Sequence, residues 1–357
     1  MKTLLIICRY IVGLLFIFSG LIKANDPLGL SYKMQEFFEV WHWTGLEQYT
    51  LALSILMIAF EIIAGVAVIL GWQMRLFSWL LLGLILFFTF LTGYALFSGK
   101  IKTCGCFGDC IPLTADQSFM KDLFLLALIL FLFLNRNRIQ PGFSTRASLI
   151  LLSVTTVFSF ALQGHVLYHL PLVDCLPYKE GKRIQDQMRI PAGSIPDSSV
   201  ISFVYQKAGK EVEFTADKFP EDFSDEQYTF IRRYDKLIRK GNAEPAIKDF
   251  VLLSATGTDT TRELLSQPGE AYWLFIKELE KNDVDAVTRA LSQFRPMYIV
   301  SPVAGSVEEQ LGEKLNGVPV LRCDVVAVKT AARNNLTLYK INQGVILDKW
   351  ALKDKLR

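Results

Sequence analysis

The sequence predicts an α-helical membrane bundle followed by a soluble α/β domain. Two observations support this division of the 357-residue chain. Five apolar runs, each close to the ~20 residues needed to cross a bilayer, lie before residue 170, and the remainder is charged and punctuated by proline. Between the third and fourth runs, three of the six cysteines fall between Cys104 and Cys110. This loop is the first place to look for chemistry.

Each apolar run is predicted to be a transmembrane helix. The runs are Thr3 to Leu21, Thr50 to Leu70, Leu76 to Leu96, Phe119 to Leu134 and Leu149 to Tyr168. The first run resembles a signal peptide, but it contains Arg9 and exceeds a typical h-region, so we expect it to be retained. The predicted divisions are a bundle over 1–134 with a cysteine loop at 98–118, and a cytoplasmic loop with the fifth helix over 135–170.

Basic residues in the short loops predict the orientation. The loops on one side of the membrane carry basic residues and no acidic residue. Their basic residues are Lys2, Arg75, Arg136, Arg138 and Arg146. The lysines of the other loops are diluted by acidic residues. We therefore expect a cytoplasmic N-terminus, with the cysteine loop and the C-terminal domain on the opposite side of the membrane.

The cysteine loop allows two interpretations. A Cys104–Cys106 ring would need the kinked backbone that Gly105 permits, and a strained bridge of that kind is easily reduced, with Cys110 as a resolving thiol. A permanent structural bridge is the alternative. No histidine lies near and a fourth ligand is missing, so we expect no metal.

Three further cysteines lie outside the loop. Cys8 is expected to be a reduced apolar residue of the first span. Cys175 and Cys323 form a candidate bridge between the linker and the soluble domain. The number of cysteines expected outside the cytoplasm is odd, and the sequence leaves their connectivity open.

Two features of the bundle have both a functional and a packing interpretation. Glu61 lies in mid-span, where an ionisable group either handles protons or contacts a quinone, or else is a hydrogen-bonded packing residue. Gly65, one turn away, would let another helix approach. The segment from Tyr32 to Trp43 has an apolar stripe at helical spacing, which predicts a helix in the membrane interface or packed on protein.

These residues carry a family resemblance. Phe18 to Lys23, Phe60 to Gly65, and Cys104 to Gly108 resemble the MauE branch of the DoxX-like membrane proteins over roughly residues 1–134. The resemblance implies a four-helix membrane bundle and an association with thiol–disulfide redox, and for MauE with maturation of the disulfide-rich methylamine dehydrogenase. Cys110, the fifth span and the external domain depart from that pattern and resemble the long DoxX-family proteins of Bacteroides-type bacteria. The resemblance implies a bacterial inner-membrane protein with a periplasmic C-terminal domain.

The soluble part is predicted to hold a linker, a hairpin and a helix over 171–248 and a thioredoxin-like domain over 249–357. The hairpin strands are Val200 to Tyr205 and Glu211 to Thr215, and Ser224 to Arg239 is predicted to be a helix. The expected elements of the second part are strands Asp249 to Ser254, Ala271 to Ile276 and Met297 to Val300, helices Asp283 to Phe294, Val307 to Leu315 and Asp324 to Arg333, and a hairpin of Thr337 to Ile341 with Val345 to Trp350. The position of the thioredoxin Cys-x-x-Cys reads Lys277 to Lys281, so the domain lacks a dithiol.

Two functions are compatible with this sequence. The first is a membrane thiol–disulfide oxidoreductase or disulfide-maturation accessory protein, in which Cys104, Cys106 and Cys110 exchange disulfides with an exported thiol-containing or thioredoxin-like partner. A quinone near Glu61 is its candidate electron acceptor. The second is a membrane scaffold whose external domain docks partner proteins. Membrane lipid is an expected contact, and a net charge of +3 without a basic cluster gives no case for nucleic acid.

Overall fold

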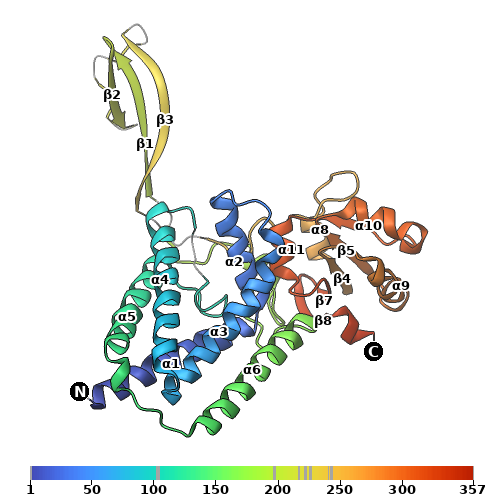
Figure 1. Ribbon diagram of the computed structural model, residues 1–357. Coiled ribbons are helices and arrows are strands. Elements are labelled where there is room, and N and C mark those ends of the chain that lie inside the picture. The colour runs from blue at the N-terminus through green and yellow to red at the C-terminus, as the bar shows by residue number, and fades with distance from the viewer. Residues whose placement is uncertain are drawn as a thin grey trace.

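In the computed structural model, five long helices form a bundle and a mixed sheet follows it (Figure 1). The structure describes residues 2–101, 105–195, 198–215, 218–220, 223–224, 227–239, 241 and 244–356. The five helices are long and apolar enough to cross a membrane, as predicted. They are α1 (Lys2–Ala24), α3 (Thr50–Leu70), α4 (Met74–Ser98), α5 (Ala115–Leu134) and α6 (Thr145–Tyr168).

The helices alternate in direction, so the connections gather at two ends of the bundle. At one end, Arg75 Nε donates to Asn137 Oδ1 at 3.0 Å, which joins the α3–α4 turn to the loop with η2 (Arg136–Arg138). At the other end lie the cysteine loop, the segment between α1 and α3, and the C-terminal domain (Figure 1). The cysteine loop and this domain therefore share one end of the bundle.

Helices α1 and α3 approach closely because each has a glycine at the crossing. A Cβ added to Gly65 would lie 2.7 Å from the Gly13 carbonyl oxygen and 2.8 Å from Ile17 Cγ1. No side chain fits there without moving backbone. The predicted role of Gly65 in helix approach is confirmed.

Replacing Gly65 with alanine is expected to destabilise the bundle by roughly 1–3 kcal/mol, because the new methyl group must push α1 away. Gly83 in α4 is the matched control, since a Cβ there meets nothing within 4 Å. Gly83→Ala should be neutral or slightly stabilising. Unfolding in mixed micelles measures both variants, and equal stability of the two would contradict the packing account.

Helix α2 (Pro27–Val40) lies between α1 and α3 in the sequence and begins earlier than predicted. Asp26 caps it by accepting from Gly29 N at 3.1 Å, and η1 (Glu47–Tyr49) follows it. Its apolar stripe packs on the bundle, where Phe37 is 5% exposed. The interpretation of this stripe as a face packed on protein is confirmed.

The C-terminal domain is built on a five-stranded sheet in the order β6-β5-β4-β7-β8. Strand β4 is parallel to β5 and antiparallel to β7. Its side chains alternate between two cores, with Trp273 and Phe275 on the α11 face and Leu274 and Ile276 on the face covered by α9, α10 and α12. The strands are β4 (Glu270–Ile276), β5 (Met297–Ser301), β6 (Val320–Arg322), β7 (Leu336–Asn342) and β8 (Val345–Ala351).

Short helices connect and cover this sheet. The predicted helices after β4 and β5 and the terminal hairpin are confirmed, whereas α8 and strand β6 were not predicted. The likeness to thioredoxin stays a prediction. The helices are α7 (Ile184–Gln187), α8 (Thr261–Ser266), η3 (Lys281–Asp283), α9 (Val284–Gln293), α10 (Ala304–Leu311), η4 (Gly312–Leu315), α11 (Val325–Ala331) and α12 (Leu352–Lys355).

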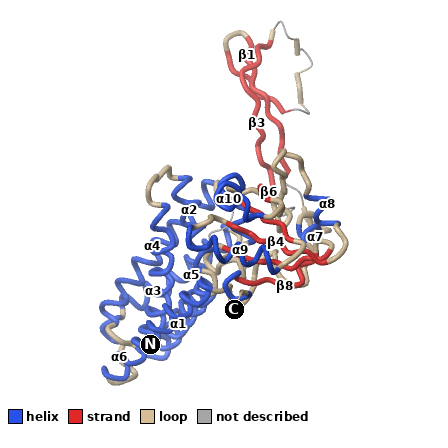
Figure 2. Tube along the Cα trace, turned by 90° about the vertical axis from the view of Figure 1, so that its right-hand side faces the viewer, coloured by secondary structure: helices blue, strands red, loops and turns tan. Residues whose placement is uncertain are grey.

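A three-stranded antiparallel sheet extends away from the rest of the molecule (Figures 1 and 2). It consists of β1 (Ser198–Lys207), β2 (Lys210–Thr215) and β3 (Tyr228–Arg239) in the order β2-β1-β3. The hairpin of β1 and β2 confirms the prediction.

Two predicted elements were wrong. The helix expected over Ser224 to Arg239 is replaced by β3, whose Tyr, Thr, Phe and Ile residues suit a strand and pair along β1. The strand expected from Asp249 to Ser254 is reduced to isolated bridges at Leu253. Asp249 has φ of 53°, which interrupts an extended chain.

Candidate functional site

The cysteine loop lies over a cavity in the bundle. The cavity has a volume of about 250 Å³ and is lined by α1, α2, α3, α4, α5 and the loop. The apolar stripe that runs along α2 to Trp41 contributes Met34, Phe37 and Trp41 to its wall. Cys106 and the ionisable side chains that also line the cavity form what we call its polar side. Cys106 is a free thiol. Cys104, its candidate ring partner, lies outside the described residues.

A buried ion pair forms part of this polar side. Lys23 Nζ donates to both carboxylate oxygens of Glu61 at 2.5 and 2.7 Å, and the two side chains are 3% and 1% exposed. Ser19 Oγ donates to Glu61 at 3.2 Å and to the Cys106 carbonyl at 3.0 Å. Ser19 therefore links the ion pair directly to the cysteine loop.

A second ion pair completes the polar side. Lys121 Nζ donates to Asp122 Oδ1 at 2.5 Å, and Thr92 Oγ1 donates to the other oxygen of Asp122 at 3.0 Å. Asp122 is fully buried, and Lys121 also lies over the Phe107 ring at 5.4 Å from its centroid. The two pairs place two ammonium groups at the wall that carries Cys106.

Burial raises the pKa of the Cys106 thiol above its ordinary value, and the positive charge of Lys121 opposes this shift. The thiol is therefore protonated at neutral pH, and its conversion to the nucleophilic thiolate depends on the nearby cations. Ser118 is fully buried beside it, and a hydrogen bond from its hydroxyl to the Cys106 sulfur also lowers the pKa of the thiol. This hydroxyl is available as a donor to a thiolate.

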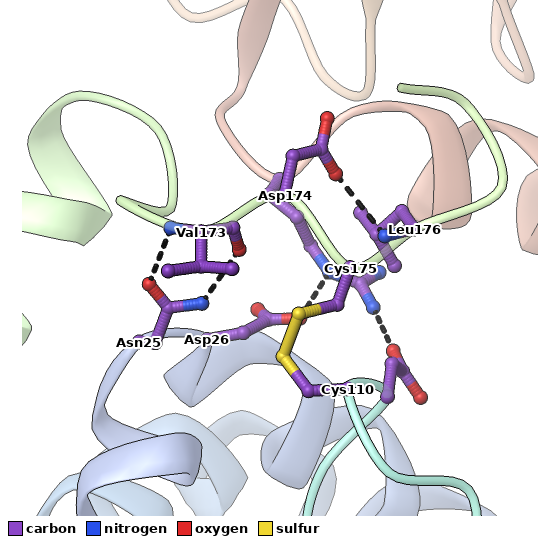
Figure 3. Close-up of a disulfide and its surroundings, with 9 residues drawn as sticks. Asn25, Asp26, Cys110, Val173, Asp174, Cys175 and Leu176 are labelled. Atoms are coloured by element: carbon purple, nitrogen blue, oxygen red, sulfur yellow. Dashed lines mark hydrogen bonds and ion pairs between the residues drawn. A yellow bond between two sulfur atoms is a disulfide. The ribbon is translucent and has the colours of Figure 1, made fainter. Parts of the chain in front are cut away.

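The third loop cysteine joins the bundle to the chain that follows α6. Cys110 forms a disulfide with Cys175 (Figure 3). Both residues are half-buried, and beside them Asn25 exchanges two hydrogen bonds with the backbone of Val173, at 2.8 and 2.9 Å (Figure 3). The candidate Cys175–Cys323 bridge was wrong, because Cys323 is a buried free thiol in the core of the sheet domain.

Arg333 holds the C-terminal domain against the same loop. It donates from Nε to Asp26 at 2.7 Å and from Nη2 to Asp109 at 2.5 Å. The arginine is 5% exposed, whereas Asp26 is 15% and Asp109 43% exposed. One guanidinium thus binds both the start of α2 and the cysteine loop, immediately beside the disulfide.

A second contact of this interface contains a lysine with a shifted pKa. Lys277 Nζ donates to the hydroxyl of Tyr32 at 3.3 Å. Burial, and then the charge of Arg333, lower the pKa of Lys277 to about 8, while burial raises that of Tyr32 to about 12. Lys329 adds positive charge and Asp26 opposes it. Docking therefore favours the neutral lysine.

Docking of the domain is expected to strengthen as pH rises from about 8 toward 10.5, since Lys277 has lost its proton in the docked state and keeps it in the released state. Below pH 8 both states are protonated and the dependence disappears. Hydrogen exchange of α2, corrected for the intrinsic rate at each pH, measures it. Lys277→Met should remove the pH dependence, and the exposed Lys281→Met should retain it; an unchanged slope in Lys277→Met would contradict the assignment.

The candidate residues of the sequence are only partly brought together. Cys106 and Glu61 line one cavity, and Cys110 lies at the adjacent disulfide. Sequence reasoning does not identify Lys23, Lys121 or Asp122 as site residues, because charges at the ends of apolar runs also act as orientation signals. Lys23 ends the segment Phe18 to Lys23, and Lys121 and Asp122 lie at the start of the fourth apolar run; a charge inside or at the edge of a span was the available signal.

Cys323, unlike Cys106, lies in the core of the sheet domain and does not line the cavity. It precedes the short helix α11 and is 4% exposed, and burial raises its pKa to about 12. This environment is typical of a buried structural cysteine.

Comparison with known families supports a MauE-like membrane protein over the first part of the chain. Residues 1–135 match the family described as methylamine utilisation protein MauE, and this range covers α1 to α5. Residues 199–240, which include β2 and β3, match a domain of unknown function, DUF8463. No curated protein matches the chain. No solved structure matches it either.

Proposed function

We propose that this multi-pass membrane protein exchanges disulfides with an exported partner through its loop cysteines Cys104, Cys106 and Cys110. The observation that carries the proposal is that two cysteines only four residues apart are in different chemical states and different surroundings. Cys106 is a free thiol at a cavity in the bundle, and Cys110 is disulfide-bonded at the edge of the C-terminal domain. An exported partner can approach Cys110, whereas Cys106 faces the interior of the bundle.

The chemistry starts at the Cys110–Cys175 bond. A partner thiolate attacks one sulfur, the bond between the two cysteines breaks, and a mixed disulfide forms. The second thiol of the partner then releases it as a disulfide and leaves Cys110 and Cys175 reduced. In the oxidised form of the loop, Cys106 is bonded to Cys104. The Cys110 thiolate attacks this disulfide, the Cys104–Cys106 bond breaks, and Cys175 then resolves the mixed disulfide and re-forms the Cys110–Cys175 bond. Two electrons thus pass from the partner to Cys104 and Cys106, which end as thiols, and a two-electron acceptor such as a quinone restores their disulfide; the free Cys106 of the structure is the reduced form.

The side chains around Cys106 suit this role. Lys121 and the Ser118 hydroxyl favour the thiolate that burial alone disfavours. The expected placement of the loop on the periplasmic side of a bacterial inner membrane would give it access to exported thiol proteins. The match to the MauE family makes an accessory role in methylamine utilisation one candidate, while α6 and the C-terminal domain are additions to the matched region.

Trapping of mixed disulfides tests the exchange. In Cys106→Ala the reduced Cys110 cannot pass its electrons on, so this variant, quenched in acid and alkylated, should retain covalent adducts with an exported thiol protein, identified by mass spectrometry. Cys110→Ala lacks the bond that the partner attacks and should retain none. Cys323→Ala is the matched control and should retain none. If Cys106→Ala yields no adduct and the loop cysteines keep one redox state at all potentials, the exchange does not occur.

A scaffold is the second candidate, and the Arg333 contact favours it. The same arginine binds the cysteine loop and α2, so a permanent Cys110–Cys175 bridge would hold the domain rigidly at the membrane for docking. In that case the trapping experiment gives no adducts, and partner binding is unaffected by Cys106→Ala.

A further inference from the structure

The cavity beneath Cys106 has an apolar rim on the membrane-spanning faces of the bundle. Leu53 of α3 and Phe87 of α4 line the cavity and are 42% and 44% exposed on the outside of these helices. Both belong to spans whose outer surface meets lipid. The cavity is therefore accessible from the bilayer between α3 and α4, and the molecule that enters must be lipid-soluble.

The wall selects a planar head group. Phe37, Phe88 and Trp41 contribute aromatic rings from two helices, and Met34 and Met57 add flexible thioethers. The volume of about 250 Å³ is near the lower limit for small-molecule pockets, so it accommodates a single ring while an attached chain extends toward the lipid.

The polar side offers hydrogen-bond donors that the protein does not fully use. An ammonium group has three donors. Lys23 directs two of them to Glu61 and Lys121 directs one to Asp122 among the described residues. Three lysines line the cavity, and each is paired with a carboxylate: Lys23 with Glu61, Lys121 with Asp122 and Lys33 with Glu36. The charges therefore cancel, and the cavity favours a neutral acceptor such as a carbonyl oxygen over an anionic head group.

From this arrangement we infer that the cavity binds a lipid-soluble quinone, with the ring between the aromatic side chains and a carbonyl oxygen at Lys23 or Lys121. The inference rests on the proposed function for its redox role. Oxidation of Cys106 with a second loop thiol breaks two S–H bonds and forms one S–S bond. The two electrons and two protons go to the two carbonyl oxygens, and the quinone becomes a quinol.

Binding can be measured without turnover. The full chain in nanodiscs is titrated with decylubiquinone while Trp41 fluorescence is followed, with Trp41→Phe defining the contribution of this residue among the six tryptophans. The paired variant Lys23→Met/Glu61→Gln removes the donor and leaves no unpaired charge, and it should weaken binding about tenfold or more, the order of one lost hydrogen bond to a charged donor. Thr155→Val on the outer face of α6 is the control and should bind normally.

The outcomes separate this inference from the proposed function. Cys106→Ala should still bind the quinone, because the thiol is not needed to hold it. If decylubiquinone does not quench Trp41, or if palmitate or decanol competes equally well, the quinone site is overturned, whatever the trapping experiment shows. If the quinone binds and Cys106→Ala traps no adduct, the site stands and the exchange function fails.

Discussion

Arg333→Met is expected to release the C-terminal domain from the bundle, at a cost of roughly 3–5 kcal/mol. The change leaves Asp26, which is 15% exposed, without its cation, and it also removes the partner of Asp109. Because Asp109 is 43% exposed and remains partly hydrated, most of the cost should come from Asp26. The hydrogen bond from Arg333 to the Lys329 carbonyl is lost as well.

Hydrogen exchange of α2 and of the cysteine loop measures this release, since both lie against the domain only in the docked state. Arg322→Met is the matched control, because that arginine is exposed on β6. Adding Asp26→Asn and Asp109→Asn to Arg333→Met should recover part of the loss by removing the unpaired charges. Normal protection in Arg333→Met would show that the domain is held by other contacts.

Glu61→Gln is expected to destabilise the bundle by a similar amount, roughly 3–5 kcal/mol, because it leaves the Lys23 ammonium unpaired inside a membrane protein. Lys23 is 3% exposed, and it donates to both carboxylate oxygens of Glu61. The carboxylate also accepts from Ser19, which holds the Cys106 carbonyl, so the change should loosen the cysteine loop.

A double-mutant cycle separates charge burial from packing. Lys23→Met/Glu61→Gln should be more stable than Glu61→Gln alone, because neither partner then remains as a buried charge. Unfolding in mixed micelles gives the three free energies. Additive effects of the two changes would mean that the ion pair contributes no coupling in the bundle.

The membrane part was predictable because its signal is long and uniform. Five apolar runs suffice to define five spans, and the stripe of Met34, Phe37, Phe38 and Trp41 identified α2. The predicted fourth span, Phe119 to Leu134, begins later than α5 because Asp116 interrupts the apolar run in the first turn of the helix. Lys121 and Asp122, which lie inside the predicted run, line the cavity.

The extended sheet was harder, because charged residues alternate with apolar ones along β3. This alternation predicts a solvated helix from Tyr228 to Arg239. In the structure the same segment is a strand that pairs with β1 over most of the length of β1. Local spacing could not decide between the two, since pairing with a strand more than twenty residues away supplies the stabilisation.

The disulfide and the ion pair of the site were not predictable from the spacing of residues in the sequence. Cys110 lies four residues from Cys106 and 65 residues from Cys175, yet its disulfide partner is the distant one. The bundle brings the ends of α1, the cysteine loop and the chain after α6 together, and only that arrangement makes the bond. In the same way, Lys23 meets Glu61 across 38 residues through the α1–α3 contact.

The proposed exchange requires Cys106 to change its redox state in the working protein. Native membranes are equilibrated at a series of potentials from about −300 to −120 mV, which spans known thiol–disulfide proteins, and free thiols are then alkylated and mapped by mass spectrometry. Cys8 and Cys323 are internal controls that should stay reduced throughout. The account predicts that Cys106 passes from thiol to disulfide within this range; a Cys106 that keeps one state at every potential would contradict it.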